Sequence, residues 1–452
     1  MSSANLASSI SDLPDISNGL SNSKYVQVAP SRDVTGANFP NGSQYYNFSV
    51  SGNTWWCPQK TFLRMRIKYT QADGTTQLVT TDGISPNPFM CGNLFDSCEF
   101  RVGGKTLCRV GENVAQVSAF KDRMSKSKGW LETIGEQSNF TSADVILRQS
   151  EIVSDGANLV QGTLVADGLR ESKLLREAKE LDAIWQPPLS IFDVKGCLPA
   201  GSYSLVLNPA NVSRYQLNSI LSDGEKTAGL GNDFQFEITD VYLYVATIDG
   251  EMVSNKSYSL DLQNCECQVQ KIEGRGLTQR YFSVSPSTTK LAVAYQDTRV
   301  NSSTQASASL FTVSPAVQDT YGQGSVQNEL SRFYISYASM QKPQPDASPE
   351  YDATTGVDRL GQRFNETLLE SGLYWNPAGS ESYDDWRARG LIMLYSFPKA
   401  GDDASTRVQV NQQFKGTTDI DNMNVLLFSM SRVAAQVTVS NGEVSMLELK
   451  ER

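Results

Sequence analysis

Hydrophobic and polar residues alternate along much of this chain, which is the pattern of β-strands with one buried face. In Leu63–Tyr69 every second residue is apolar, and the residues between them are basic. The same period of two returns at Tyr203–Leu207 and at Phe333–Tyr337. Periods typical of helices are rare. The pattern therefore predicts a chain built mostly of short strands.

Turn signals separate these strands. Gly103-Gly104 and Asn441-Gly442 each stand between two apolar runs, which predicts a hairpin at both places. The alternation slips by one residue near Asp240, and such a slip is typical of a β-bulge. Leu391–Phe397 is almost continuously apolar, which predicts a strand covered on both faces. We expect another strand to stop at Pro343 and Pro345, because proline has no backbone N–H.

After the N-terminal arm, helical spacing of apolar residues occurs in three places. We expect helices within 112–128, over about 170–182, and along a stripe from Val357 to Leu368. Each lies between strand signals rather than in a run of helices. They are therefore predicted to be insertions in loops of a β-protein.

The strand pattern breaks near residue 250 and then begins again. At 452 residues the chain is too long for one ordinary core. We expect an all-β fold of two tandem eight-stranded jelly-roll sandwiches with a few short helices in loops. The predicted boundaries are 1–24 for an N-terminal arm, 25–248 for the first jelly roll and 249–452 for the second.

The chain is acidic, with a formal net charge of -10. Such a chain repels phosphate backbones, so we expect no sequence-specific binding of nucleic acid. One local exception is the basic face of Arg64, Arg66 and Lys68. This face could meet nucleic acid inside a particle, or it could be a solvated or salt-bridged surface, and the second interpretation is favoured.

The residues for catalysis or cofactor binding are sparse. The chain contains no histidine, which excludes triads that use a histidine base. Gly104-Lys105-Thr106 resembles the end of a phosphate-binding loop, but Glu99 stands where that motif begins with glycine. A hairpin turn is the better interpretation. We therefore expect no enzyme activity, no catalytic residue and no cofactor.

Seven cysteines are scattered along the chain, an odd number that does not suggest a disulfide framework. We expect them to be reduced and mostly buried in a protein made in the cytosol and not secreted. Cys265 and Cys267 are the only close pair, and alternation places both thiols on one face of a strand. A zinc site would need two further ligands, so no metal site is predicted.

Three stretches resemble a known family. Asn93–Thr106 is an apolar strand that turns over glycines and returns, and Ile184–Leu207 contains Trp-Gln-Pro-Pro-Leu-Ser followed by a Leu-Pro-Ala-Gly turn. Leu330–Pro345 is a strand that ends in Gln-Lys-Pro. In this order and spacing they resemble the double jelly-roll major capsid proteins of icosahedral DNA viruses, the lineage of adenovirus hexon and of virophage and polinton-like capsids.

The resemblance implies a structural shell subunit. Members of this family form trimers whose six jelly rolls make a pseudo-hexagonal tile. It therefore implies a homotrimer, contacts between trimers, a location in the virion, and penton and minor capsid proteins as partners. Whether a membrane lies inside such a shell stays open.

The competing interpretation is a two-domain β-protein that binds carbohydrate or a receptor, such as a lectin or a spike. Tyr374, Trp375, Tyr383 and Trp386 cluster after the third expected helix and could stack on a sugar. Packing at the base of a long loop is the alternative for the same residues, and it is favoured. A glycosidase is a third class, but paired carboxylates such as Asp384 and Asp385 are common on surfaces.

The N-terminal arm carries few apolar residues among serines and asparagines. Leu6, Ile10 and Leu13 have helical spacing on this polar background. The segment has too little apolar surface to order by itself, but it could do so on a neighbouring subunit. These three residues are the candidate inter-subunit contacts.

Overall fold

The computed structural model describes most of the chain between residues 24 and 450. The described residues are 24–51, 53–71, 73–77, 84–85, 90–139, 152–155, 158–161, 180–210, 218–219, 234–249, 256–297, 327–328, 330–352, 355–372, 383, 386, 391–399, 406–415, 423–440 and 443–450. The candidate arm residues Leu6, Ile10 and Leu13 lie outside them.

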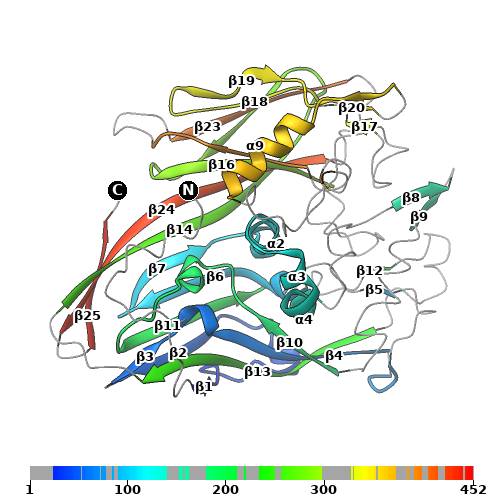
Figure 1. The fold of residues 1–452 in the computed structure, drawn as a ribbon. Coiled ribbons are helices and arrows are strands. Elements are labelled where there is room, and N and C mark those ends of the chain that lie inside the picture. Colours follow the sequence, from blue (N-terminus) through cyan, green and yellow to red (C-terminus); the bar gives the residue numbers. More distant parts are fainter. Residues whose placement is uncertain are drawn as a thin grey trace.

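The first half of the chain forms two facing sheets, drawn in the lower part of Figure 1. One sheet has the order β1-β13-β4-β10, with β3 added beside β13, and the other has the order β2-β11-β6-β7. The strands are β1 (Lys24–Val28), β2 (Gln44–Val50), β3 (Thr54–Trp56), β4 (Phe62–Gln71), β6 (Phe95–Val102), β7 (Lys105–Val110), β10 (Glu180–Trp185), β11 (Gly201–Pro209) and β13 (Phe234–Asp249).

The second half repeats this arrangement in the upper part of Figure 1. Its sheets have the orders β14-β24-β16-β22, with β25 beside β24, and β15-β23-β18-β19. The strands are β14 (Lys256–Lys271), β15 (Thr278–Ser283), β16 (Thr288–Asp297), β18 (Leu330–Tyr337), β19 (Met340–Ala347), β22 (Ile392–Ser396), β23 (Arg407–Phe414), β24 (Met423–Ser440) and β25 (Glu443–Lys450).

The two halves have the same topology. Each half has eight main strands when the added strands β3 and β25 are left out. If these eight are numbered along the chain, both halves pair the first, eighth, third and sixth strands in one sheet. Both pair the second, seventh, fourth and fifth strands in the other sheet. This crossing order is that of a jelly roll, so the chain is a double jelly roll, as the sequence predicts.

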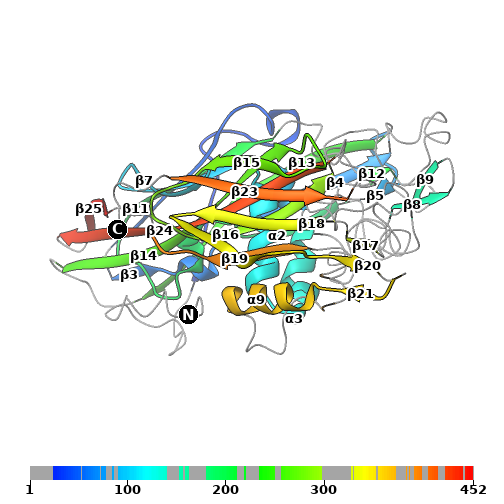
Figure 2. The same cartoon turned by 90° about the horizontal axis from the view of Figure 1, so that it is seen from above.

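Helices and short strands occupy the connections. The helices are α1 (Met90–Asn93), α2 (Val114–Ser125), α3 (Lys128–Trp130), α4 (Glu136–Asn139) and α9 (Gly361–Ser371), with a π-helical turn η5 (Leu131–Gly135) and 3-10 turns η2 (Gly36–Asn38), η3 (Pro58–Lys60) and η6 (Ser190–Asp193). The short strands are β5 (Ile84–Ser85), β8 (Ile152–Asp155), β9 (Asn158–Gln161), β12 (Asn218–Ser219), β17 (Gln327–Asn328), β20 (Tyr351–Asp352) and β21 (Val357–Asp358). Figure 2 shows α2 and α9 close to each other on one side of the molecule.

Local sequence signals are confirmed at several points. The register of β13 against β4 shifts between Ile238 and Asp240, where the alternation slips. Gly103 and Gly104 both have positive φ between β6 and β7, which glycine adopts without steric cost. β24 and β25 pair as a hairpin from Ser440 and Glu443 outward, around Asn441-Gly442.

Leu391–Phe397 is covered on both faces, as predicted. Met393 and Tyr395 of β22 belong to the core of the second roll. Ile392 and Leu394, which alternate with them, belong to the apolar cluster that includes the core of the first roll. The outward face of the β14-β24-β16-β22 sheet therefore packs on the first roll.

Three expectations about element ends are wrong, and one of them is the helix stripe from Val357, because Val357 lies in β21 and α9 begins at Gly361. Pro343 and Pro345 do not stop a strand, because both lie within β19. β19 is at the edge of its sheet, where a missing N–H can face away from the neighbouring strand. The helix expected over about 170–182 is also wrong at its end, since Glu180–Asp182 belong to β10 and residues 170–179 lie outside the described residues.

The C-terminal hairpin returns to the first roll. The Val444 amide of β25 donates to the Ala200 carbonyl at 2.7 Å. A Cβ built on Gly201 would lie 2.9 Å from Cβ and Cγ2 of Val444. Gly201 is therefore needed for this close approach between β11 and β25.

We expect Gly201→Ala to destabilise the chain by about 1–3 kcal/mol because the added methyl group overlaps Val444. Chemical denaturation measures this loss. Combining it with Val444→Ala, which removes the overlapping Cγ2 methyl group but keeps Cβ, should recover part of the loss. An equal loss in the presence and absence of Val444→Ala would contradict the explanation.

Candidate interaction surfaces

The two rolls contact each other directly. Helix α2, inserted between β7 and β10, lies against the outward face of the second roll's sheet (Figure 1). The rings of Phe120 and Phe428 stack with centroids 4.4 Å apart. Both side chains are buried. This pair joins the first roll to β24 of the second roll through apolar packing.

Polar contacts border this stack. The Asn113 side chain donates to the Cys267 carbonyl of β14 at 3.0 Å. The Ser190 hydroxyl of η6 donates to the side-chain carbonyl of Asn264 at 2.6 Å. Because hydrogen bonds need fixed geometry, these contacts specify one orientation between the two rolls.

A charged group lies on the same helix. Lys121 is paired with Asp193 at 2.6 Å and also donates to the Pro188 carbonyl at 3.3 Å. The neighbouring Asp122 has its pKa raised from 3.8 to about 7, first because burial disfavours the carboxylate and also because Asp193 repels it. Lys126 and Lys121 oppose this rise in pKa. The carboxyl of Asp122 therefore titrates near neutral pH.

We expect the contribution of Asp122 to the free energy of unfolding to fall as pH rises from about 4 to 7. In this window the folded chain keeps a proton on Asp122 that the unfolded chain has released, so unfolding is favoured by at most about 1.4 kcal/mol per pH unit. Asp122→Asn stays neutral and should remove this slope. Thermal denaturation at several pH values checks it, and a difference between the two chains that does not depend on pH would contradict it.

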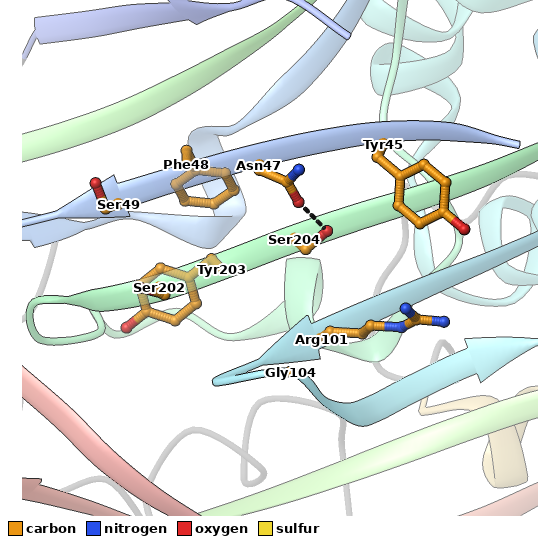
Figure 3. A pocket seen from close by; sticks show the side chains of 9 residues that line it. All are labelled: Tyr45, Asn47, Phe48, Ser49, Arg101, Gly104, Ser202, Tyr203 and Ser204. Atoms are coloured by element: carbon orange, nitrogen blue, oxygen red, sulfur yellow. Dashed lines mark hydrogen bonds between the residues drawn. The ribbon is translucent and has the colours of Figure 1, made fainter. Parts of the chain in front are cut away.

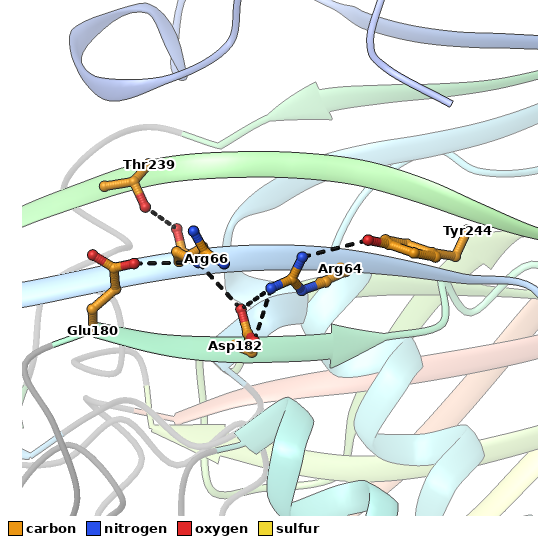
Figure 4. Close-up of polar contacts among 6 residues, drawn as sticks. All are labelled: Arg64, Arg66, Glu180, Asp182, Thr239 and Tyr244. Atoms are coloured by element: carbon orange, nitrogen blue, oxygen red, sulfur yellow. Dashed lines mark hydrogen bonds and ion pairs between the residues drawn. The ribbon is translucent and has the colours of Figure 1, made fainter. Parts of the chain in front are cut away.

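The basic face of β4 is paired with carboxylates (Figure 4). Arg64 binds Asp182 of β10 through two hydrogen bonds of 2.8 and 2.9 Å. Arg66 lies 3.2 Å from Glu180, and Lys68 lies 3.9 Å from Glu237 of β13. These pairs form within one sheet of one chain. They leave little unbalanced positive charge for a phosphate backbone, which favours the salt-bridge interpretation of this face.

Aromatic side chains continue this outward face toward its edge strand. Phe62 of β4 stacks on Tyr244 of β13 with ring centroids 5.4 Å apart. Tyr25 of β1 contacts Phe62 at 5.6 Å and is 54% exposed. Tyr244 also accepts a hydrogen bond from Arg64 at 3.4 Å, which connects the aromatic and the charged parts.

A shallow hollow of about 460 Å³ lies on the outward face of β2, β11 and β6 (Figure 3). Tyr45, Asn47, Arg101 and Ser204 are among its lining residues. The Ser204 hydroxyl donates to Asn47 at 2.7 Å, and Arg101 is paired with Glu99 at 2.7 Å. These polar groups bind each other between and along strands. The geometry therefore assigns them to the sheet rather than to a ligand.

The residues that the sequence offered for phosphate binding or thiol chemistry lie in a hairpin or in the core. Lys105 begins β7 directly after the glycine turn, so this segment is a hairpin and not the start of a helix. All seven cysteines are buried, and Cys265 and Cys267 lie together on β14 as predicted. Within the described ranges, no three histidine, cysteine or acidic side chains are grouped as a metal site would need.

The helices in the described part of the chain are too short or too polar to cross a membrane.

The candidate sugar platform does not form around Trp386. This side chain is 1% exposed, and its indole N–H donates to the Ile392 carbonyl at 3.1 Å. Its ring packs against Phe364 of α9 and Tyr383. Tyr374, Trp375, Asp384 and Asp385 lie outside the described residues. Trp386 therefore supports a loop base, the alternative that the sequence left open.

Sequence reasoning missed the residues that join the rolls. Phe120 belongs to a predicted helix, but its periodicity does not say that the helix packs on another roll. The partner Phe428 lies in a long apolar strand. The only sequence signal for its contact with another roll was that both faces of such a strand are apolar.

Eight large apolar side chains are exposed in the described part of the chain: Tyr25, Val26, Tyr45, Ile134, Leu277, Tyr281, Met340 and Leu369.

Known structures share this fold across nearly the whole chain. A chain in the cryo-EM structure of the Sputnik virophage aligns with a TM-score of 0.55 and 10% identity, over 96% of this chain and 89% of that one. The crystal structure of the mavirus major capsid protein aligns with a TM-score of 0.50 and 11% identity, over 97% and 93%. The capsid of the virus PBCV-1 gives 0.50 and 8%, over 95% and 97%.

These structural neighbours are double jelly-roll major capsid proteins, so the resemblance drawn from the sequence is confirmed at the level of the fold. No protein-family model matches the chain, and no curated protein sequence matches it either. The similarity therefore lies in the arrangement of strands and not in the sequence.

Proposed function

We propose that the chain is a major capsid protein, a structural subunit of an icosahedral viral shell that has no enzyme activity. The observation that carries this proposal is the same double jelly-roll fold in viral capsid structures over 96% of the chain. The buried contact between the rolls supports it. A rigid pair of sandwiches is a suitable building block for a shell.

The subunit forms a homotrimer in this proposal, and the six rolls of three chains make one pseudo-hexagonal tile. The arm and the rolls keep the predicted boundaries 1–24, 25–248 and 249–452, except that Lys24 of β1 and Asp249 of β13 belong to the first roll. Trimers contact each other and also penton and minor capsid proteins. The chain is made in the host cytosol, is not secreted and is located in the virion.

Native mass spectrometry of the purified chain tests the trimer. The expected mass is three times the 49.6 kDa of one chain. Electron microscopy of expressing cells then tests the shell, where particles are expected. A stable monomer at micromolar concentration, together with cells that contain no particles, would contradict the proposal.

The arm is assigned to contacts between trimers on the inner side of the particle. Leu6, Ile10 and Leu13 provide its apolar contacts, whose burial offsets the entropy lost when the segment orders. Deleting residues 1–21 should therefore leave trimers intact and impair shell assembly. Native mass spectrometry checks the trimers and electron microscopy checks the shells.

A control variant replaces residues 1–21 by a serine- and asparagine-rich segment of equal length without the apolar residues. It should behave like the deletion. Loss of trimers in either variant, or normal shells without the apolar residues, would show that the arm has another role.

A further inference from the structure

Two of the seven cysteines lie against each other in the first roll. Cys57 follows β3, and Cys197 lies between η6 and β11, 140 positions further along the chain. Their sulfur atoms are 2.9 Å apart, and both side chains are fully buried. β3 belongs to the sheet that contains β13, whereas β11 belongs to the facing sheet. The two thiols therefore lie between segments that continue into opposite sheets of the sandwich.

The backbone brings these cysteines opposite each other. The Trp56 amide donates to the Leu198 carbonyl at 2.8 Å, and the Leu198 amide donates to the Trp56 carbonyl at 2.7 Å. In an antiparallel ladder, the pair next to one that exchanges both bonds is not hydrogen-bonded, and its Cα atoms are only about 4.5 Å apart. Cys57 and Cys197 are that next pair. The Cys57 amide accordingly donates elsewhere, to the Ala246 carbonyl of β13 at 2.8 Å.

This arrangement suits a covalent bond between the two sulfurs. Disulfides in proteins join Cα atoms about 4.4–6.8 Å apart and need Cβ atoms that point toward each other. Side chains of one cross-strand pair lie on the same face of the ladder, which meets the second condition. The Thr61 hydroxyl donates to the Cys57 carbonyl at 3.1 Å and helps to hold this residue in place. The bond can therefore form with little movement of the backbone.

The pair also differs chemically from the other five cysteines. A hydrogen bond from Cys197 lowers the pKa of the Cys57 thiol against the opposing effect of burial, and the charge of Lys60 contributes to the lowering. Burial raises the pKa of the five remaining thiols, which are those of Cys91, Cys98, Cys108, Cys265 and Cys267. The thiolate is the form that attacks a disulfide. Of these six thiols, that of Cys57 therefore reaches the reactive form most readily.

We propose that Cys57 and Cys197 are a site of covalent modification, where a disulfide bond forms when the folded chain meets a small-molecule disulfide such as oxidised glutathione. The other five cysteines stay reduced. The bond links the end of β3 in one sheet to the segment that leads into β11 of the other sheet, and so closes the sandwich covalently. This inference does not depend on the proposed function, because it concerns one roll of a single chain.

The reaction is a thiol–disulfide exchange in two steps. The Cys57 thiolate attacks one sulfur of the small disulfide, so a mixed disulfide forms and the first small thiolate leaves. The Cys197 thiol then gives up its proton and attacks the Cys57 sulfur, which releases the second small thiolate. Two electrons and the two thiol protons pass to the small disulfide, which ends as two thiols.

The reagent reaches the pair through a short segment. Cys197 is fully buried, but Lys195 two positions before it is exposed and Gly196 is half-buried. Opening of this segment exposes the sulfurs while the strands of both sheets stay paired. We therefore expect the exchange to take place under native conditions and not only in the unfolded chain.

Counting of free thiols tests the proposal. The folded chain is incubated with oxidised glutathione, freed of excess reagent, and then denatured in the presence of N-ethylmaleimide. Mass spectrometry should find five of the seven cysteines alkylated, and all seven in a sample reduced with dithiothreitol before alkylation. Peptide mapping should find the Cys57 peptide linked to the Cys197 peptide. Seven alkylated cysteines without reduction, a stable mixed disulfide with glutathione, or a link between other cysteines would overturn the proposal.

Single variants test whether these two residues are responsible. Cys57→Ala and Cys197→Ala should no longer form an intramolecular disulfide. Cys91→Ala is the matched control, because Cys91 is equally buried in the first roll and its removal should leave the bond unchanged. Circular dichroism checks that the three variants fold, and the thiol count of the unmodified chain decides if one of them does not. An intramolecular disulfide in folded Cys57→Ala or Cys197→Ala would contradict the assignment.

The bond should also stabilise the first roll. It closes a loop of about 140 residues and therefore restricts the unfolded chain. Differential scanning calorimetry should show an unfolding temperature at least about 5 °C higher for the oxidised chain than for the reduced chain. Cys57→Ala treated in the same way should show no such rise. An oxidised chain that carries the bond but unfolds at the same or a lower temperature would overturn the proposal that the folded sandwich accommodates it.

Discussion

Replacing Trp56 by alanine should destabilise the first roll by about 3–5 kcal/mol, the range for removing a large aromatic side chain from a core. Trp56 is fully buried and stacks on Phe100 with ring centroids 5.0 Å apart. Its indole N–H donates to the Thr61 hydroxyl at 2.8 Å. That hydroxyl also accepts from the Ala246 amide at 3.1 Å, so the substitution removes packing and loosens the contact with β13.

Chemical denaturation followed by tryptophan fluorescence and circular dichroism measures this loss. Trp56→Phe is the matched control, since it keeps an aromatic ring and loses only the N–H and part of the volume. It should cost clearly less than alanine. A loss below about 1 kcal/mol for Trp56→Ala would contradict the place of this residue in the core.

Replacing Phe120 by alanine should have the second large effect, because it removes one ring of the stack between the rolls. We expect a loss of about 3–5 kcal/mol and separate unfolding transitions for the two rolls where the unmodified chain shows one. Phe428→Ala should do the same from the other side. Since the two rings touch, the double variant should lose less than the sum of the single variants, by about 0.5–1.5 kcal/mol.

Differential scanning calorimetry of the four chains measures both effects. Phe364→Ala is the control, because Phe364 packs on Trp386 within the second roll. It should lower the stability of that roll without separating the transitions. Strictly additive losses for Phe120→Ala and Phe428→Ala would show that the stack does not couple the rolls.

The strands could be predicted well because their signals are local. Leu63–Tyr69 alternates, and it is a strand in β4 with a buried apolar face. The slip at Asp240 and the turn at Gly103-Gly104 also needed only neighbouring residues. The helix stripe from Val357 was less accurate, since Val357 lies in β21 and α9 begins at Gly361. Helix ends depend on a few competing hydrogen bonds and are therefore harder to place.

Other features depend on contacts far apart in the sequence. Pro343 and Pro345 looked like strand breakers, but β19 tolerates them because it is an edge strand. Glu180–Asp182 were expected to end a helix, yet pairing with β4 makes them a strand. Tertiary pairing prevails here because the strand gains ladder hydrogen bonds to β4 and, at Asp182, a salt bridge to Arg64.

The interaction surfaces were the least predictable part. For the aromatic cluster near Trp386 the sequence left a binding platform and a loop base open, and the burial of Trp386 favours the loop base. The stack of Phe120 on Phe428 joins residues about 300 positions apart, and no local pattern marks such a pair. The basic residues of β4 could be placed on an outward face from their alternation, but their carboxylate partners could not be identified.

Cryo-EM images of the purified oligomer test the central proposal most directly. If the chain is a capsid subunit of the proposed kind, three copies should form a tile with a hexagonal outline, and six sandwich-shaped densities should surround its axis. A well-defined monomer, or an oligomer whose rolls do not form such a ring, would contradict it.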